Sequence, residues 1–310
     1  MERKVLFQTL VTLVSFAALA AFVDFSLLFE QIQSFSLEVL AILLVATILR
    51  LILGGMRCLR TAPNPNNLGL GICIEGYLLS AFCSLFLPSA IGGDAVRIEH
   101  LSQKGGLSRP ASSAVVIWER ASGLLAMVLF LCAAILVAPT ILDGGQMLVG
   151  ASIALSIGIV VALAIISRPG LGGRAPAWWV SFTGTLREIR NPIQFVELVS
   201  WSLLAQAATI AIPFSIGLLA SGGGWDTALL LAAITPIVWL VTMIPISLGG
   251  NGLREVSYLG AADLFGIDPI IALSAALALT LSNILAAICG FFAFNRWSKG
   301  HKDAVTAKEE

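Results

Sequence analysis

Long apolar segments alternate with short polar connections along almost the whole chain. A transmembrane helix needs about 20 consecutive, mostly apolar residues. The segments that meet this length clearly are Val5–Val23, Leu37–Gly54, Ala121–Ala138, Met147–Ser167, Leu198–Ala220 and Ile270–Phe294. Two further segments are less regular, because Leu70–Leu87 contains Glu75 and Ala228–Leu248 contains two prolines. The pattern predicts an all-α polytopic membrane protein.

The basic residues between these segments predict their orientation. Lys and Arg are enriched on the cytoplasmic side of membrane proteins, and both termini of the chain carry them. The connections before and after Leu70–Leu87 are both basic, so this segment is expected to enter the membrane and return without crossing. Ala228–Leu248 is expected to do the same from the other face. This predicts about six full spans plus two re-entrant hairpins, or alternatively eight spans, and both arrangements place the N- and C-termini in the cytoplasm.

Composition supports the membrane assignment and excludes other classes. Of the 310 residues, 58% are hydrophobic and 12% are charged, whereas soluble domains carry roughly 25% charged residues. The net charge of +0 gives no reason to expect a nucleic-acid partner. The scattered cysteines are interpreted as small hydrophobic residues, and His100 and His301 have no nearby second ligand. We therefore expect no metal site and no cofactor.

Two similar polar motifs interrupt the apolar pattern, one in each half of the chain. Pro88–Arg97 and Pro245–Arg254 align without a gap as Pro-x-x-aliphatic-Gly-Gly-(Asp/Asn)-x-aliphatic-Arg. Each follows one of the two irregular apolar segments, which indicates an inverted internal duplication. The expected parts are one membrane domain over 1–295, with pseudo-repeats of roughly 5–138 and 147–295, and a disordered cytoplasmic polar tail over 296–310.

The first motif has the residues of an anion-binding site. Gly92 and Gly93 permit positive φ, so that backbone N–H groups can converge on an anion. Asp94 is suited to cap the helix that follows, and Arg97 would lie in the first turn of that helix. Together they predict a site for a phosphate or a carboxylate. The alternative is a tight turn between helices, with Arg97 as a cytoplasmic anchor.

The second motif predicts an unequal copy of the same site. It repeats the two glycines as Gly249 and Gly250, and the base as Arg254, which Glu255 follows. Asn251 stands where the first motif has an acid. The two half-sites are therefore expected to differ in charge.

Charged residues outside the motifs are further candidates. Glu119 and Arg120 precede the Ala121–Ala138 span, where they either form a salt bridge with each other at the interface or face a headgroup cavity. Glu75 lies in an apolar segment, where it either pairs with Arg97 or Arg120 or serves as a protonatable group.

Other polar residues suit the membrane interface. Arg50 is expected to snorkel to the inner interface. The Trp178–Trp179 pair lies in the connector Arg174–Glu197. Its rings either lie at the headgroups or pack on neighbouring helices.

Three stretches carry a resemblance to a known family. Leu87–Arg97, Trp118–Leu124 and Pro245–Glu255 resemble the lysylphosphatidylglycerol synthase transmembrane (flippase-like) family, and the resemblance covers roughly residues 5–295. In its best-known members this module precedes a soluble domain that transfers an aminoacyl group from tRNA to phosphatidylglycerol, and the module moves the product across the membrane. No such domain follows here, so we expect the chain not to make the lysyl-lipid itself. Stand-alone members are linked to transport of other lipids, including hopanoids and polyprenyl-linked glycans.

The resemblance and the motifs together predict a lipid translocase of the bacterial cytoplasmic (inner) membrane. It would move a lipid with a polar, anionic headgroup (a phospholipid, hopanoid or polyprenyl-linked lipid) between leaflets. Arg97, Arg120 and Arg254 would contact the anion, the motif glycines would allow close backbone approach, and Asp94 and Glu119 would position the arginines.

Two other functions stay open. The chain could be a membrane subunit or catalyst of lipid or glycan modification that acts with a separately encoded transferase, or a structural partner without transport. No nucleophile–base constellation is visible, which favours a role that is not enzymatic. No nucleotide motif is visible either, so lipid movement would be facilitated, or coupled to an ion gradient through Glu75 or Asp94.

Overall fold

The computed structural model describes most of the chain after the first predicted span. The described residues are 35–63, 68–85, 87, 89–137, parts of 150–161, 177–188, 192–220, 223–242 and 252–306. The predicted spans Val5–Val23 and most of Met147–Ser167 lie outside them, as does the second motif up to Asn251. The described residues form α-helices and no strand, which confirms the predicted fold class.

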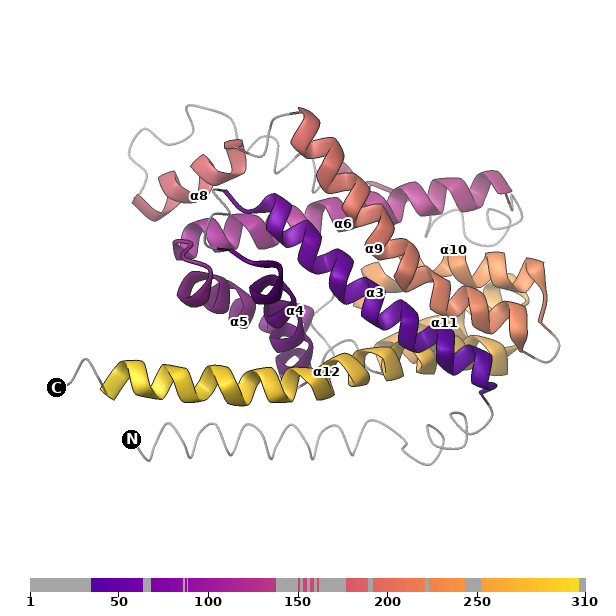
Figure 1. Ribbon diagram of the computed structural model, residues 1–310. Coiled ribbons are helices and arrows are strands. Elements are labelled where there is room, and N and C mark those ends of the chain that lie inside the picture. The colour runs from indigo at the N-terminus through magenta and orange to yellow at the C-terminus, as the bar shows by residue number, and fades with distance from the viewer. Residues whose placement is uncertain are drawn as a thin grey trace.

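The helices pack side by side as a bundle. Their bounds are α3 (Leu37–Thr61), α4 (Leu70–Ser84), α5 (Ser89–Lys104), α6 (Arg109–Val137), α8 (Ala177–Glu188), α9 (Pro192–Leu219), α10 (Trp225–Thr242), α11 (Leu253–Phe265) and α12 (Pro269–Thr306). Helix α3 runs diagonally across the bundle beside α9, and α12 packs against α4 along the lower edge (Figure 1). Helices that are distant in the sequence therefore enclose the same interior.

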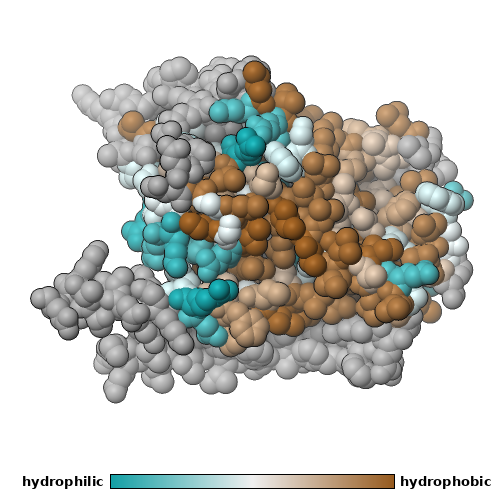
Figure 2. Space-filling model, in the orientation of Figure 1, coloured by the Kyte–Doolittle hydropathy of each residue, from teal (hydrophilic) through white to brown (hydrophobic). Residues whose placement is uncertain are grey.

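Five of the described helices are long and apolar enough to cross a membrane, namely α3, α6, α9, α10 and α12. Helix α3 shows the surface that this requires, because Leu44, Val45 and Ile48 all point outward. Figure 2 shows the resulting broad hydrophobic face, with hydrophilic residues around its edges and most of them on the left. Backbone groups in a bilayer have no water to bond, and helices satisfy them internally. The chain is a multi-pass membrane protein.

The two irregular segments each become the first helix of a packed pair. Helix α4 packs on α5, and α10 packs on α11. At 1.5 Å per residue, the 15 and 16 residues of α4 and α5 extend about 23 Å, which is less than the ~30 Å hydrocarbon core. These lengths agree with a re-entrant first pair, whereas the 18 residues of α10 are enough to cross. The number of spans and the inverted repeat stay predictions.

The glycines of the first motif do not form the predicted loop, and Asp94 does not cap a helix. Gly92, Gly93 and Asp94 all lie inside α5, which begins at Ser89. The physical reason is close packing between α4 and α5: a Cβ on Gly93 would lie 2.1 Å from the Oγ of Ser84. Small residues let membrane helices approach in this way. The predicted loop at these two glycines is therefore wrong, whereas anion binding by the motif stays untested.

Helix α12 corrects the prediction of a disordered tail. It continues to Thr306, because no proline interrupts the sequence after Pro269. The Trp297 indole donates a hydrogen bond of 3.1 Å to the Oε1 of Gln103 on α5, and its ring contacts Phe294. Residues 296–306 are thus helical and anchored at Trp297.

The predicted connector contains helix α8, which packs on α6. Trp178 is 58% exposed, whereas the ring of Trp179 contacts Phe182 at a centroid distance of 5.7 Å. Both rings of this contact belong to α8, so the two interpretations of the tryptophan pair stay open.

Candidate functional site

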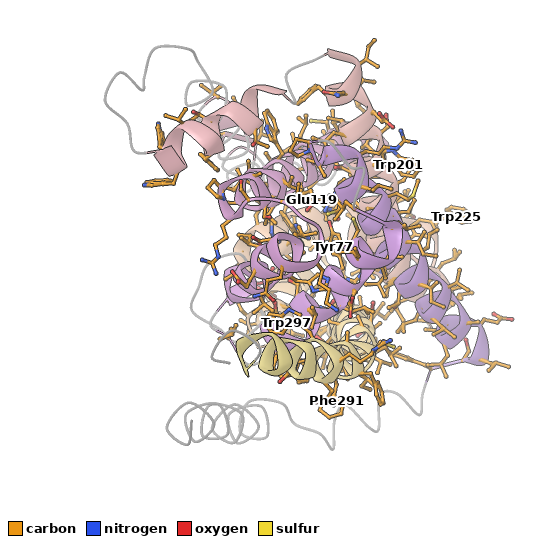
Figure 3. The ribbon with its side chains drawn as sticks, turned by 60° about the vertical axis from the view of Figure 1, so that its left-hand side comes forward. Tyr77, Glu119, Trp201, Trp225, Phe291 and Trp297 are labelled. Carbon is orange, nitrogen blue, oxygen red and sulfur yellow. The ribbon has the colours of Figure 1, made fainter. Side chains whose placement is uncertain are left out.

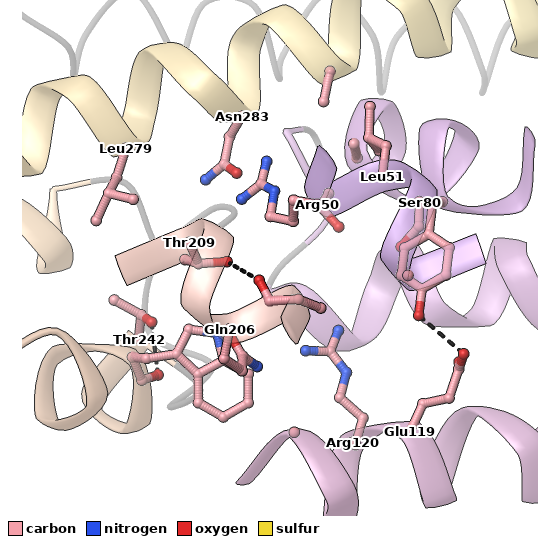
Figure 4. Close-up of a pocket in the computed structure, with 18 of the residues that line it drawn as sticks. Arg50, Leu51, Ser80, Glu119, Arg120, Gln206, Thr209, Thr242, Leu279 and Asn283 are labelled. Carbon is pink, nitrogen blue, oxygen red and sulfur yellow. Dashed lines mark hydrogen bonds between the residues drawn. The ribbon is translucent and has the colours of Figure 1, made fainter. Parts of the chain in front are cut away.

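A partly open cavity of about 280 Å³ lies among the helices. Every described helix in the list above except α8 contributes to its lining (Figure 4). Two kinds of charged side chain line it. The basic ones are Arg50, Arg57, Arg97, Arg120 and Arg254, and the acidic ones are Asp94 and Glu119. Among the described lining residues, arginines therefore outnumber carboxylates by five to two.

Glu119 is the centre of the most buried charge cluster. Its side chain is 1% exposed, and it forms an ion pair with the guanidinium of Arg97. The hydroxyl of Tyr77 donates to Glu119 over 3.0 Å, and the Nε of Arg57 lies 3.8 Å from the same carboxylate. Figure 3 shows Tyr77 and Glu119 together inside the bundle, whereas Trp225 lies at its outer edge. The single negative charge of Glu119 is thus shared by two arginines.

Aromatic and small residues hold these arginines in place. The Arg97 guanidinium carbon lies 4.3 Å from the centre of the Tyr77 ring, a distance suited to a cation–π contact. Arg57 donates to the Tyr77 hydroxyl over 2.9 Å. The stem of Arg97 passes over Gly76, where a Cβ would lie 3.2 Å from the arginine Cγ. Glycine at this position therefore makes room for the buried arginine.

Asp94 and Arg120 form a second ion pair. The Nε of Arg120 lies 2.8 Å from the Oδ2 of Asp94. The other oxygen of Asp94 is buried and has no hydrogen-bond partner among the described residues. The Arg120 side chain is 32% exposed, against 4% for Arg97. Arg120 is therefore the more accessible of the two arginines.

Arg254 reaches the same cavity from α11. It donates over 2.8 Å to the hydroxyl of Thr280, which donates over 2.7 Å to Glu255. Glu255 in turn accepts a bond from the backbone N–H of Gly252, where φ is +78°. The structure thus brings the arginines of both motifs, Arg97 and Arg254, to one cavity.

The acids and bases near the first motif pair across helices. Glu119 and Arg120 are neighbours in the sequence, yet Glu119 pairs with Arg97 and Arg120 with Asp94, because successive residues point to different faces of a helix. A Glu119–Arg120 salt bridge is therefore a wrong interpretation. Pairing of Glu75 with Arg97 or Arg120 is also wrong.

Glu75 lies 3.7 Å from the Nε2 of His100 and does not line the cavity. Its proposed role as a protonatable coupling group is untested, as is ligand binding by every residue predicted for the site. Gly249, Gly250 and Asn251 lie outside the described residues.

Sequence reasoning missed most of the cavity lining, including three residues of its charged wall. Arg50 was expected at the membrane interface, but it lines the cavity, as do Arg57 and Tyr77. The signal was present in the spacing, because Arg50 and Arg57 lie seven positions apart, and such residues share one face of a helix. The residues that pack against that face could not be predicted from the sequence of α3 alone.

These features define a polytopic helical membrane protein with a partly open, arginine-rich cavity. The chain matches the family described as Lysylphosphatidylglycerol synthase TM region over residues 5–290. It belongs to that family, as the motifs indicate. No curated protein and no solved structure matches it. Family membership indicates a membrane protein of lipid modification or translocation.

Proposed function

We propose that this protein is a lipid translocase, which moves a lipid with an anionic headgroup between the leaflets of the bacterial cytoplasmic membrane. The observation that carries the proposal is the charge of the cavity, in which five arginines face two carboxylates among the described lining residues. Charged groups inside membrane proteins are costly and usually mark a substrate path. A phosphate in the headgroup would supply the negative charge that the cavity lacks.

The size of the cavity supports a headgroup, rather than a whole lipid, as its occupant. A volume of about 280 Å³ is at the lower end of the range of small-molecule sites. The lining includes apolar side chains such as Trp239 and Leu279, which suit the first carbons of the lipid chains. The remaining chain length would stay in the hydrocarbon core, where burial is favourable.

The arginines of the cavity have different roles in this proposal. Arg120 and Arg254 would be among the arginines that contact the phosphate. Arg97 is held by Glu119 and Tyr77, so it would mainly shape the wall. Asp94 pairs with Arg120, so it would compete with the phosphate for this arginine. Coupling to an ion gradient through Glu75 or Asp94 stays part of the proposal.

Alternating access is expected because the lining helices come from both predicted halves of the chain. Helices α3 to α6 come from the first predicted half and α9 to α12 from the second, and both groups line the cavity. Rocking of one repeat against the other would open such a cavity to each side in turn. Both termini would be cytoplasmic, and a separately encoded transferase would supply the lipid if the protein acts in a modification route.

The experiment is a translocation assay in proteoliposomes that contain the full chain. Chain-labelled fluorescent phosphatidylglycerol or phosphatidylcholine is incorporated, and an impermeant reductant bleaches the outer leaflet. Wild type should accelerate the loss of the inner pool of phosphatidylglycerol. Arg254→Gln should slow this by about tenfold or more, because it removes a charge-assisted contact.

The control is Arg109→Gln, which removes an exposed arginine that pairs with Glu99 away from the cavity. This variant should translocate at the wild-type rate. The absence of acceleration by wild type for either lipid would refute the proposal. A change in total lipid composition in cells that lack the protein, with unchanged leaflet distribution, would favour lipid modification instead.

A further inference from the structure

Arg50 is a cavity arginine that forms no ion pair among the residues that the structure describes. It lies in the middle of α3, and its guanidinium extends into the cavity together with the amide of Asn283 on α12 (Figure 4). Among the residues that the structure describes, no carboxylate lies within 4.0 Å of Arg50. Segment 243–251, which carries the second motif, contains no Asp or Glu in the sequence.

Each of the other cavity arginines reaches a carboxylate, either directly or through a bridging hydroxyl. Arg57 and Arg97 share Glu119, and Arg120 pairs with Asp94. Arg254 is linked through Thr280 to Glu255. Arg254 also repels Arg50 electrostatically. Arg50 and Arg254 are therefore the cavity arginines that form no direct ion pair with a carboxylate among the described residues.

A guanidinium that is partly removed from water needs an anion or several acceptors to offset its lost hydration. Arg50 has a neutral amide nearby and a second cation beyond it, so a mobile anion is the group that would satisfy it. Arginine binds phosphate oxygens in a bidentate manner, which makes phosphate the fitting anion.

We propose that Arg50, supported by Arg254, forms the phosphate subsite of the cavity, and that this subsite selects a phosphodiester whose remaining headgroup is uncharged and hydroxylated. This inference rests on the proposed lipid translocase function and names its substrate class. The other polar groups that line the cavity include the amides of Gln206 and Asn283 and the hydroxyl of Thr209. Such groups bond to hydroxyls without requiring a charge.

The same arrangement disfavours a cationic headgroup. An ammonium in the cavity would meet five arginines, whereas both lining carboxylates are already engaged by arginine. Unfavourable charge contacts are an effective way to reject a competing ligand. We therefore expect phosphatidylglycerol to bind better than phosphatidylcholine, although both contain the same phosphodiester.

The test measures binding of short-chain lipids to the full-length protein in a neutral detergent. The ligands are dioctanoyl-phosphatidylglycerol, dioctanoyl-phosphatidylcholine and inorganic phosphate. Wild type should bind the phosphatidylglycerol at least about tenfold more tightly than the phosphatidylcholine, and Arg50→Gln should weaken that binding by about tenfold or more. Arg50→Lys keeps the charge but not the bidentate geometry. Its affinity for the phosphatidylglycerol should therefore lie between those of wild type and Arg50→Gln.

The matched control is Arg60→Gln on the same helix. Arg60 is exposed, pairs with Glu197 and does not line the cavity, so its removal should leave lipid binding unchanged. Thermal unfolding separates binding from structure. Without ligand, Arg50→Gln should be as stable as wild type or more stable, because an uncompensated charge is removed, but phosphatidylglycerol should no longer raise its midpoint.

Several results would overturn the inference. Equal binding of the two lipids by wild type would refute the selectivity, and unchanged binding by Arg50→Gln would refute the subsite. Inorganic phosphate that binds as tightly as the lipid would show that the ligand is free phosphate. Arg50-dependent lipid binding without translocation would refute the translocase and leave the subsite in place. Normal translocation by Arg50→Gln would refute the subsite and leave the translocase function in place.

Discussion

Loss of the Glu119 charge should disturb this protein more than loss of any exposed charge. The carboxylate is 1% exposed and pairs with Arg97, while Arg57 lies 3.8 Å away. Glu119→Gln keeps the shape of the side chain but leaves two buried guanidinium groups without their anion. Removal of one partner from a buried ion pair costs about 3–5 kcal/mol. Because one carboxylate serves two arginines here, we expect a loss in the upper half of that range.

Thermal unfolding of the full chain in detergent provides the assay. A loss of this size should lower the midpoint by on the order of 10 °C. The matched control is Glu99→Gln, which breaks a solvent-exposed pair with Arg109 and should leave the midpoint nearly unchanged. Addition of Arg97→Met to Glu119→Gln should restore part of the stability, because it removes one of the stranded cations. Equal midpoints for the two Glu→Gln variants, or strictly additive losses in the double variant, would refute the reasoning.

Two further predictions concern packing and the second motif. Gly93→Ala should destabilise the α4–α5 pair by about 1–3 kcal/mol, because its Cβ would lie 2.1 Å from the Oγ of Ser84. Gly71→Ala on α4, where a Cβ meets nothing within 4 Å, should be neutral or stabilising in the same unfolding measurement. Thr280→Val should break the link from Arg254 to Glu255 and weaken phosphatidylglycerol binding severalfold; affinity equal to wild type would show that this link does not hold Arg254 in position.

The family and fold class could be predicted because they depend on local patterns. Apolar segments of membrane-spanning length are visible without any tertiary contact, and α3, α6, α9 and α12 each cover one of the predicted spans to within one residue. The motifs around Arg97 and Arg254 were likewise visible as repeated strings. Their arginines line one cavity, which agrees with an expected site between the halves.

The local geometry of the first motif was harder to predict. A Gly-Gly-Asp string is typical of a turn as well as of close helix packing. Ser80 and Ser84 on α4 decide between the two, since they occupy the space next to Gly93. The structure also places Arg97 and Arg120, which the loop-charge count assigned to one connection, in helices beside the cavity; the topology itself stays a prediction.

The sequence by itself determined that this protein is helical, spans a membrane and carries two related arginine motifs. Hydropathy and sequence repeats are properties of short segments, and they do not depend on what those segments pack against. Only the tertiary structure decided which charges are paired. Glu119 meets Arg97 and Arg57 across three helices, while Arg50 meets no described carboxylate. The partner of a buried charge is set by the packing of distant helices, and that packing also determines where positive charge remains for a ligand.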